Sequence, residues 1–201
     1  NLMTSGCGIS HSEESPPEHS PSLHGAQLWI ALPDAHRLGE PTFAHHAELP
    51  VFTHDGLRIS VLLGDVLGQV SPGKVFTPLM GAELFADAAT QATLPLRADF
   101  EYGIQVLTGR LRVDDEVLEP GTLLYLEAGR AKLHLLAEAG CRALLIGGEP
   151  LKEPLLMWWN FVARTQGELT MACQDWNAGA KYFGEVTGYP GKRLEAPLPP
   201  W

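Results

Sequence analysis

Short apolar runs separated by turn-forming residues dominate the middle of the chain. Between residues 57 and 146 these runs recur at intervals of roughly 8–12 residues and end at Gly, Pro or the Asp114-Asp115 pair. This spacing is typical of β-sandwiches and barrels, and the Asp-Asp pair indicates a tight hairpin. We predict strands over residues 57–63, 79–86, 91–96, 102–108, 111–113, 116–118, 123–126, 132–137 and 142–146.

The N-terminal part carries fewer such runs. Residues 26–32 are apolar and are bounded by Gly25 and Pro33, which predicts a strand, and residues 42–49 predict another. Residues 14–21 are rich in Ser, Pro and Glu and are expected to form a loop.

Near the C-terminus the periodicity becomes helical. Thr165 is predicted to cap a helix that runs to about Asn177, with Glu168 at the spacing of a capping box. The segment from Gly179 onward, with its four prolines, predicts an irregular tail. An aromatic cluster before the helix is expected to seal one end of the barrel; its members are Trp158, Trp159 and Phe161.

Composition excludes several classes of protein. The net charge of -10, from 24 acidic and 14 basic residues, argues against direct binding to a phosphate backbone. No apolar run is long enough to span a membrane, and the start of the chain lacks the pattern of a signal peptide. The three cysteines are far apart, which favours a reducing, cytoplasmic compartment and plain core packing for Cys141.

One short motif carries candidate chemistry. His11 and Glu13 stand two residues apart after a glycine-flanked turn, so on an extended segment their side chains leave the same face. An imidazole nitrogen and a carboxylate oxygen suit Fe(II), Ni(II), Mn(II) or another divalent transition metal. The alternative is a surface strand end whose polar groups meet only water.

The neighbourhood of this motif resembles a known family. The runs over residues 3–13 and 23–33, together with Gly147-Gly148-Glu149-Pro150-Leu151 and Phe161-Val162, are similar to the pirins, a bicupin branch of the cupins. Cys7 is a departure, since pirins usually carry a basic residue there. The chain also starts with Asn inside a motif, so we expect an N-terminally incomplete pirin-like protein.

The resemblance implies an all-β fold: a cupin-type jelly-roll barrel, a short C-terminal helix and the remnant of a preceding cupin domain. Residues 1–50 would be the end of a metal-binding cupin domain and a linker, residues 51–163 a metal-free cupin domain, and residues 164–201 the helix and tail. Within residues 51–148 only His54 and His134 occur, with no His-x-His pair, which agrees with a metal-free second domain.

The resemblance also implies a ligand set. His11 and Glu13 match two of the four pirin metal ligands, and the other two form a His-x-His pair earlier in the family's sequences. No such pair precedes His11 here, although His19 and His24 are further candidates. Two ligands leave most of the coordination shell to water, so the metal would be weakly held or absent.

Three functions stay open on this basis. The first is a metal-dependent dioxygenase of the quercetin type, acting on a flavonol-like aromatic substrate, with Glu13 also as the catalytic proton acceptor; this chain would be nearly inactive. The second is a non-enzymatic iron-binding cofactor of transcription regulators, which contacts a regulatory protein and is nuclear if the source is eukaryotic. The third is a scaffold with a vestigial metal motif. Fold alone does not separate them.

Overall fold

The computed structural model describes all residues from Asn1 to Trp201 and consists of two compact units. The first unit contains residues 1–2 and 44–150, and the second contains residues 3–43 and 151–201. The domain limits expected after residues 50 and 163 stay predictions. No helix in the structure has the length and apolar character needed to cross a bilayer.

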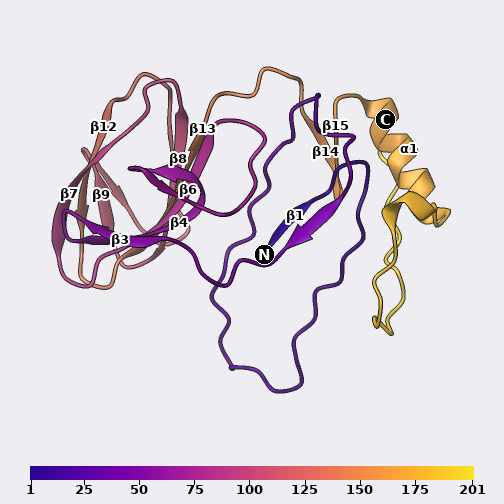
Figure 1. The fold of residues 1–201 in the computed structure, drawn as a ribbon, viewed down its shortest axis with the longest axis horizontal. Coiled ribbons are helices and arrows are strands. Elements are labelled where there is room, and N and C mark those ends of the chain that lie inside the picture. Colours follow the sequence, from indigo (N-terminus) through magenta and orange to yellow (C-terminus); the bar gives the residue numbers. More distant parts are fainter. The chain divides into compact units, whose positions relative to one another are not determined.

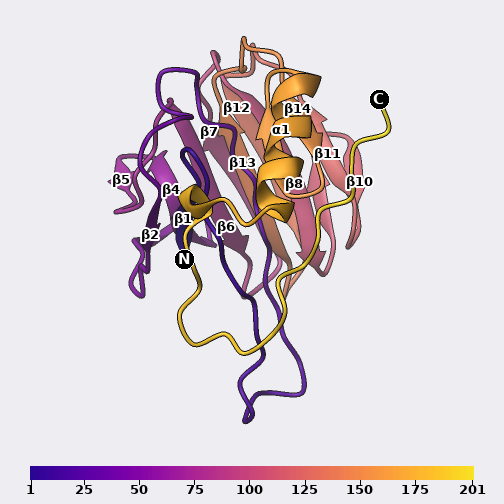
Figure 2. The same ribbon diagram turned by 90° about the vertical axis from the view of Figure 1, so that its right-hand side faces the viewer.

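The first unit is a sandwich of two antiparallel sheets, which confirms the predicted all-β cupin fold (Figure 1). The smaller sheet has the order β10 (Glu116–Leu118), β9 (Leu111–Val113), β12 (Lys132–Ala137) and β7 (Thr90–Pro95). The larger sheet, seen face-on in Figure 2, has the order β11 (Leu123–Leu126), β8 (Glu101–Thr108), β13 (Arg142–Gly148), β6 (Leu79–Phe85), β4 (Leu57–Val66) and β3 (Val51–His54). The two-residue strand β5 (Gln69–Val70) pairs with β4.

Turn chemistry sets the strand limits of the sandwich. Strands β9 and β10 pair antiparallel with Glu116 opposite Val113, so Asp114 and Asp115 form the predicted tight hairpin. Asp114 has φ +50°, in the left-handed region that aspartate tolerates better than most residues. Strands β9, β10, β11 and β12 coincide with their predicted ranges.

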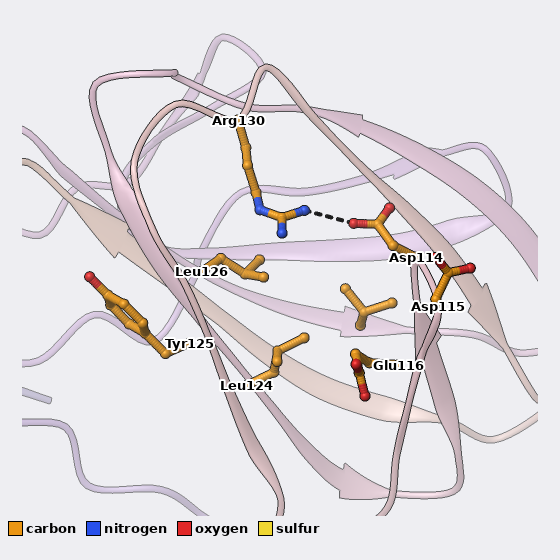
Figure 3. A pocket seen from close by; sticks show the side chains of 8 residues that line it. Asp114, Asp115, Glu116, Leu124, Tyr125, Leu126 and Arg130 are labelled. Carbon is orange, nitrogen blue, oxygen red and sulfur yellow. Dashed lines mark hydrogen bonds and ion pairs between the residues drawn. The ribbon is translucent and has the colours of Figure 1, made fainter.

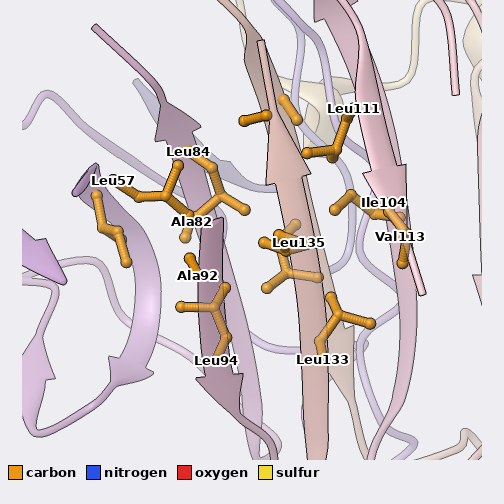
Figure 4. Close-up of a cluster of buried hydrophobic side chains, with 14 of the residues drawn as sticks. Leu57, Ala82, Leu84, Ala92, Leu94, Ile104, Leu111, Val113, Leu133 and Leu135 are labelled. Carbon is orange, nitrogen blue, oxygen red and sulfur yellow. The ribbon is translucent and has the colours of Figure 1, made fainter. Parts of the chain in front are cut away.

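The space between the sheets is filled by the inward-facing residues of both (Figure 4). On β12 and β7, Leu133 pairs with Leu94 and Leu135 with Ala92, and all four are almost fully buried. Ile104 on β8 is completely buried as well. Cys141 lies in this core, which confirms its predicted packing role, and burial raises the pKa of its thiol.

The second unit combines residues 3–43 with residues 151–201. It contains a hairpin of β14 (Leu156–Trp158) and β15 (Phe161–Ala163), the helix α1 (Gln166–Asn177) and the 3₁₀ turn η1 (Lys181–Phe183). Near the N-terminus, β1 (Leu2–Thr4) pairs with β2 (Thr42–Ala44), which is shorter than the strand predicted over residues 42–49. The strand predicted over residues 26–32 is wrong, because this segment has no regular secondary structure.

Helix α1 begins with the predicted capping box. The Glu168 backbone N–H donates to the Thr165 hydroxyl at 3.2 Å, and the Thr165 N–H donates to the Glu168 carboxylate at 3.1 Å. The same carboxylate accepts a 2.7 Å bond from the guanidinium of Arg37, which lowers the pKa of Glu168. The cap therefore joins the helix to the N-terminal segment.

The aromatic cluster packs against α1. The Trp159 ring lies 5.4 Å from Phe161 and 5.6 Å from Trp176, and Trp176 lies 5.2 Å from Phe183, measured between ring centroids. None of these rings belongs to the core of the sandwich, and the expectation that the cluster seals one end of the barrel stays a prediction. The tail turns back along α1 (Figure 1), and the Trp176 indole N–H donates to the Leu194 carbonyl at 2.7 Å.

Candidate metal-binding segment

The segment that carries His11 and Glu13 follows a turn over residues 5–8. Backbone hydrogen bonds within the turn and to Gly39 stabilise it. The Cys7 N–H donates to the Gly39 carbonyl at 2.9 Å, and the Gly8 N–H donates to the Ser5 carbonyl at 2.8 Å. Gly6 has φ +50°, and a Cβ there would collide with the Gly39 carbonyl oxygen. Glycine is therefore required at position 6 by both conformation and space.

His11 and Glu13 are both exposed, and neither forms a hydrogen bond or an ion pair. Their lone pairs are therefore available to a ligand. The neighbouring Ser12 hydroxyl donates to the Glu14 carboxylate at 3.0 Å, which leaves Glu14 partly engaged. The segment has no regular secondary structure, so strand alternation does not place the two side chains on one face, and the assignment of His11 and Glu13 as metal ligands stays a prediction.

The other candidate ligands do not complete a site. His19 interacts with the Ser20 carbonyl at 2.8 Å through Nδ1, while His24 is exposed. No group of three or more His, Cys, Asp and Glu side chains in the chain could hold a metal ion. His11 and Glu13 thus have the right donor chemistry, but this chain's residues do not form a complete coordination shell.

A second feature is a cavity of about 300 Å³ at the hairpin between β9 and β10 (Figure 3). Its floor is apolar, with Leu124 and Leu126 from β11, and its rim carries Asp114, Asp115 and Glu116. Asp114 accepts a 2.8 Å bond from Arg130, so the one cation in the lining is already paired. The lining contains no histidine or cysteine, which makes it a poor transition-metal centre.

The hairpin prediction for Asp114 and Asp115 did not include the ion pair between Asp114 and Arg130. The sequence held no signal for this pair, because the two residues lie on different loops and meet only when the sandwich closes. The Asp115 and Glu116 side chains are exposed.

Comparison with known proteins adds the family. Residues 82–182, which run from β6 to η1 and make up half of the chain, match the model of the pirin C-terminal cupin domain. The chain belongs to the pirin family. As a pirin, it carries the family's C-terminal domain together with the segment that contains His11 and Glu13.

The pirin relatives come from bacteria, plants and mammals. The chain is 42% identical over all 201 residues to a Pseudomonas aeruginosa protein named "Putative quercetin 2,3-dioxygenase PA1205", and 27% identical over 197 residues to human pirin. It spans 64% of the length of the Pseudomonas protein and 67% of human pirin.

A solved structure supports the same fold. The crystal structure of quercetin 2,3-dioxygenase from Acinetobacter baumannii matches with a TM-score of 0.82 and 44% identity. The match covers 86% of this chain and 57% of that one. The family model and this structure together establish the cupin sandwich and its family.

Proposed function

We propose that this pirin acts in a metal-dependent dioxygenase of the quercetin 2,3-dioxygenase type, with His11 and Glu13 as two ligands of a divalent metal ion such as Fe(II). The observation that carries the proposal is that an imidazole and a carboxylate, one residue apart, are exposed and free of other partners. The names of the Pseudomonas and Acinetobacter relatives support a flavonol-like substrate.

The chain's own contribution is binding and proton transfer. His11 offers a neutral nitrogen ligand and Glu13 an anionic oxygen ligand, and a carboxylate with no other hydrogen bond is also free to accept a proton from a substrate hydroxyl. A bound divalent metal would supply Lewis acidity toward the substrate oxygens. Because two protein ligands hold a metal weakly, we expect only slow turnover from the 201-residue chain by itself.

The experiment measures metal content and oxygen uptake with quercetin on the same protein. We compare the wild-type chain with the double variant His11→Ala/Glu13→Ala and with His134→Ala, an exposed histidine of the sandwich that serves as the control. Assays run with saturating Fe(II), with and without imidazole as an added nitrogen ligand. The proposal expects weak metal binding and slow, quercetin-dependent oxygen uptake, both lost only in the double variant.

A second candidate function is a non-enzymatic, metal-binding regulator. The net charge of -10 and the exposure of the His11–Glu13 segment favour contact with a protein partner over contact with DNA. Metal binding that depends on His11 and Glu13, without any oxygen uptake, would favour this regulator. Oxygen uptake equal in the wild type and the double variant would refute the dioxygenase proposal.

A further inference from the structure

We propose that the C-terminal turn formed by η1 and Gly184 positions the segment from Cys7 to Glu13, with Tyr182 and Phe183 as the positioning residues. The role of this segment in metal binding rests on the proposed function. The contacts themselves lie within the second unit and stand independently of it.

The first contact is between the Gly8 backbone and two aromatic rings. A Cβ built on Gly8 would lie 3.0 Å from Cδ1 of Phe183 and 3.0 Å from Cδ2 of Tyr182. These distances are shorter than ordinary carbon–carbon contacts, so the bare glycine backbone packs directly against both rings. A side chain at position 8 would require the two rings to move by a few tenths of an ångström, and φ +146° disfavours one there in any case.

The second contact is a hydrogen bond one residue before the proposed histidine ligand. The Ser10 hydroxyl donates to the Gly184 carbonyl at 3.3 Å, although the two residues lie 174 positions apart in the sequence. Together with the packing of Gly8, this bond connects the segment to the turn at two points. Both points lie within three residues of His11.

The turn itself is firmly supported. The Tyr182 and Phe183 rings lie 4.2 Å apart, and the Tyr182 hydroxyl donates to the Asp175 carboxylate on α1 at 3.0 Å. Phe183 is only 5% exposed and packs edge-on against Trp176. A platform fixed to a helix and an aromatic cluster can hold a loop in one conformation.

The start of the segment is fixed as well, since the Cys7 N–H donates to the Gly39 carbonyl and the Gly6 backbone packs against the same carbonyl. A segment that is already held at several points in the free chain has less conformational freedom to lose when a ligand binds. Supporting residues around metal ligands typically contribute about 10–100-fold to affinity. Loss of the turn should therefore weaken metal binding while the ligands themselves are unchanged.

The test combines hydrogen–deuterium exchange, without metal, with a Mn²⁺ titration. Tyr182→Ala and Gly8→Ala should raise amide exchange over residues 6–13 and weaken Mn²⁺ binding about tenfold. Tyr182→Phe keeps the ring and should restore both properties to near wild-type values. Tyr189→Ala, which removes an exposed tyrosine of the tail, is the matched control and should leave both unchanged.

The two readouts separate this proposal from the proposed function. If the wild-type chain binds no Mn²⁺, the proposed function fails, and exchange over residues 6–13 alone decides the positioning role. If Tyr182→Ala unfolds the unit, Ser10→Ala decides it, because this variant removes the hydrogen bond to Gly184 and leaves the aromatic cluster and the Gly8 backbone unchanged. Unchanged exchange over residues 6–13 in the folded variants would overturn the proposal.

Discussion

Replacing Glu168 by Gln probes how the N-terminal segment is joined to helix α1. The carboxylate accepts bonds from Arg37 at 2.7 Å, from the Arg164 N–H at 2.8 Å and from the Thr165 N–H at 3.1 Å. A glutamine amide keeps one acceptor oxygen, but its NH₂ group would replace the other. That NH₂ group would then point at N–H donors, either of Arg37 or of Arg164 and Thr165. The substitution therefore removes a charge and at least one hydrogen bond at once.

The expected loss follows from these bonds. Hydrogen bonds to charged groups contribute about 1.5–3 kcal/mol, and a helix cap contributes about 1 kcal/mol. Because the Glu168 side chain is 37% exposed, solvent reduces these values, and we expect about 1–2 kcal/mol less stability for the second unit.

Tryptophan fluorescence during urea unfolding measures this loss selectively. All five tryptophans, Trp29, Trp158, Trp159, Trp176 and Trp201, belong to the second unit. Glu185→Gln makes the same charge change at an exposed residue without a partner and serves as the control. Equal unfolding midpoints for both variants would refute the reasoning.

The pH dependence of the Glu168→Gln effect has a definite sign. The Arg37 hydrogen bond, followed by the Arg164 backbone bond, lowers the pKa of Glu168 in the folded chain below its unfolded value of about 4.3. The stability that the ionised Glu168 carboxylate adds to the folded chain is then fully present above the unfolded pKa, and it is lost as the pH falls through the folded pKa. The difference in stability between wild type and variant should therefore narrow in acid and stay constant from pH 6 to pH 8, roughly.

Three further predictions concern the sandwich, the N-terminal turn and the C-terminal turn. Leu135→Ala, at a site with 1% exposure between the sheets, should lower the free energy of unfolding by about 2–5 kcal/mol in far-ultraviolet circular dichroism, and a loss under about 1 kcal/mol would contradict the packing described. Gly6→Ala should destabilise the turn by about 1–3 kcal/mol and speed amide exchange at Cys7, because position 6 has φ +50° and faces the Gly39 carbonyl; unchanged exchange would refute this. Burial and the Asp175 carboxylate raise the pKa of Tyr182 to about 12. In an ultraviolet titration, the tyrosinate that forms at the highest pH should therefore be missing from Tyr182→Phe and still be present in Tyr189→Phe. The same shift means that stability associated with Tyr182 is complete below pH 10, roughly, and declines as the pH rises toward 12.

The sandwich could be predicted from the sequence because its signals are local. Alternating apolar residues and turn residues such as Asp114 and Gly121 fix strand limits without knowledge of the partner strand. The helix was predictable for the same reason, since Thr165 and Glu168 cap it within four residues.

The N-terminal segment was harder to predict because a strand needs a partner. Residues 26–32 have the composition of a strand, yet Trp29 is 50% exposed and Ile30 45% exposed, with no neighbouring strand to pair with. Apolar composition indicates that a segment can pair, and long-range structure decides whether it does.

The candidate site was only partly predictable. The motif identified His11 and Glu13, but nothing in the sequence linked Gly8 to Tyr182 and Phe183, which follow about 170 residues later. The contact between Trp159 and Trp176 was not predictable for a similar reason: apolar character predicts burial and does not say against which element.

The most direct test of the account is a Mn²⁺ titration of the wild-type chain followed by backbone amide NMR, because the ion broadens signals from nearby residues first. The account predicts that the signals of His11, Ser12 and Glu13 broaden at the lowest Mn²⁺ concentrations, and that this early broadening disappears in His11→Ala/Glu13→Ala. Broadening that begins at the acidic hairpin around Asp115, or that persists unchanged in the double variant, would contradict it.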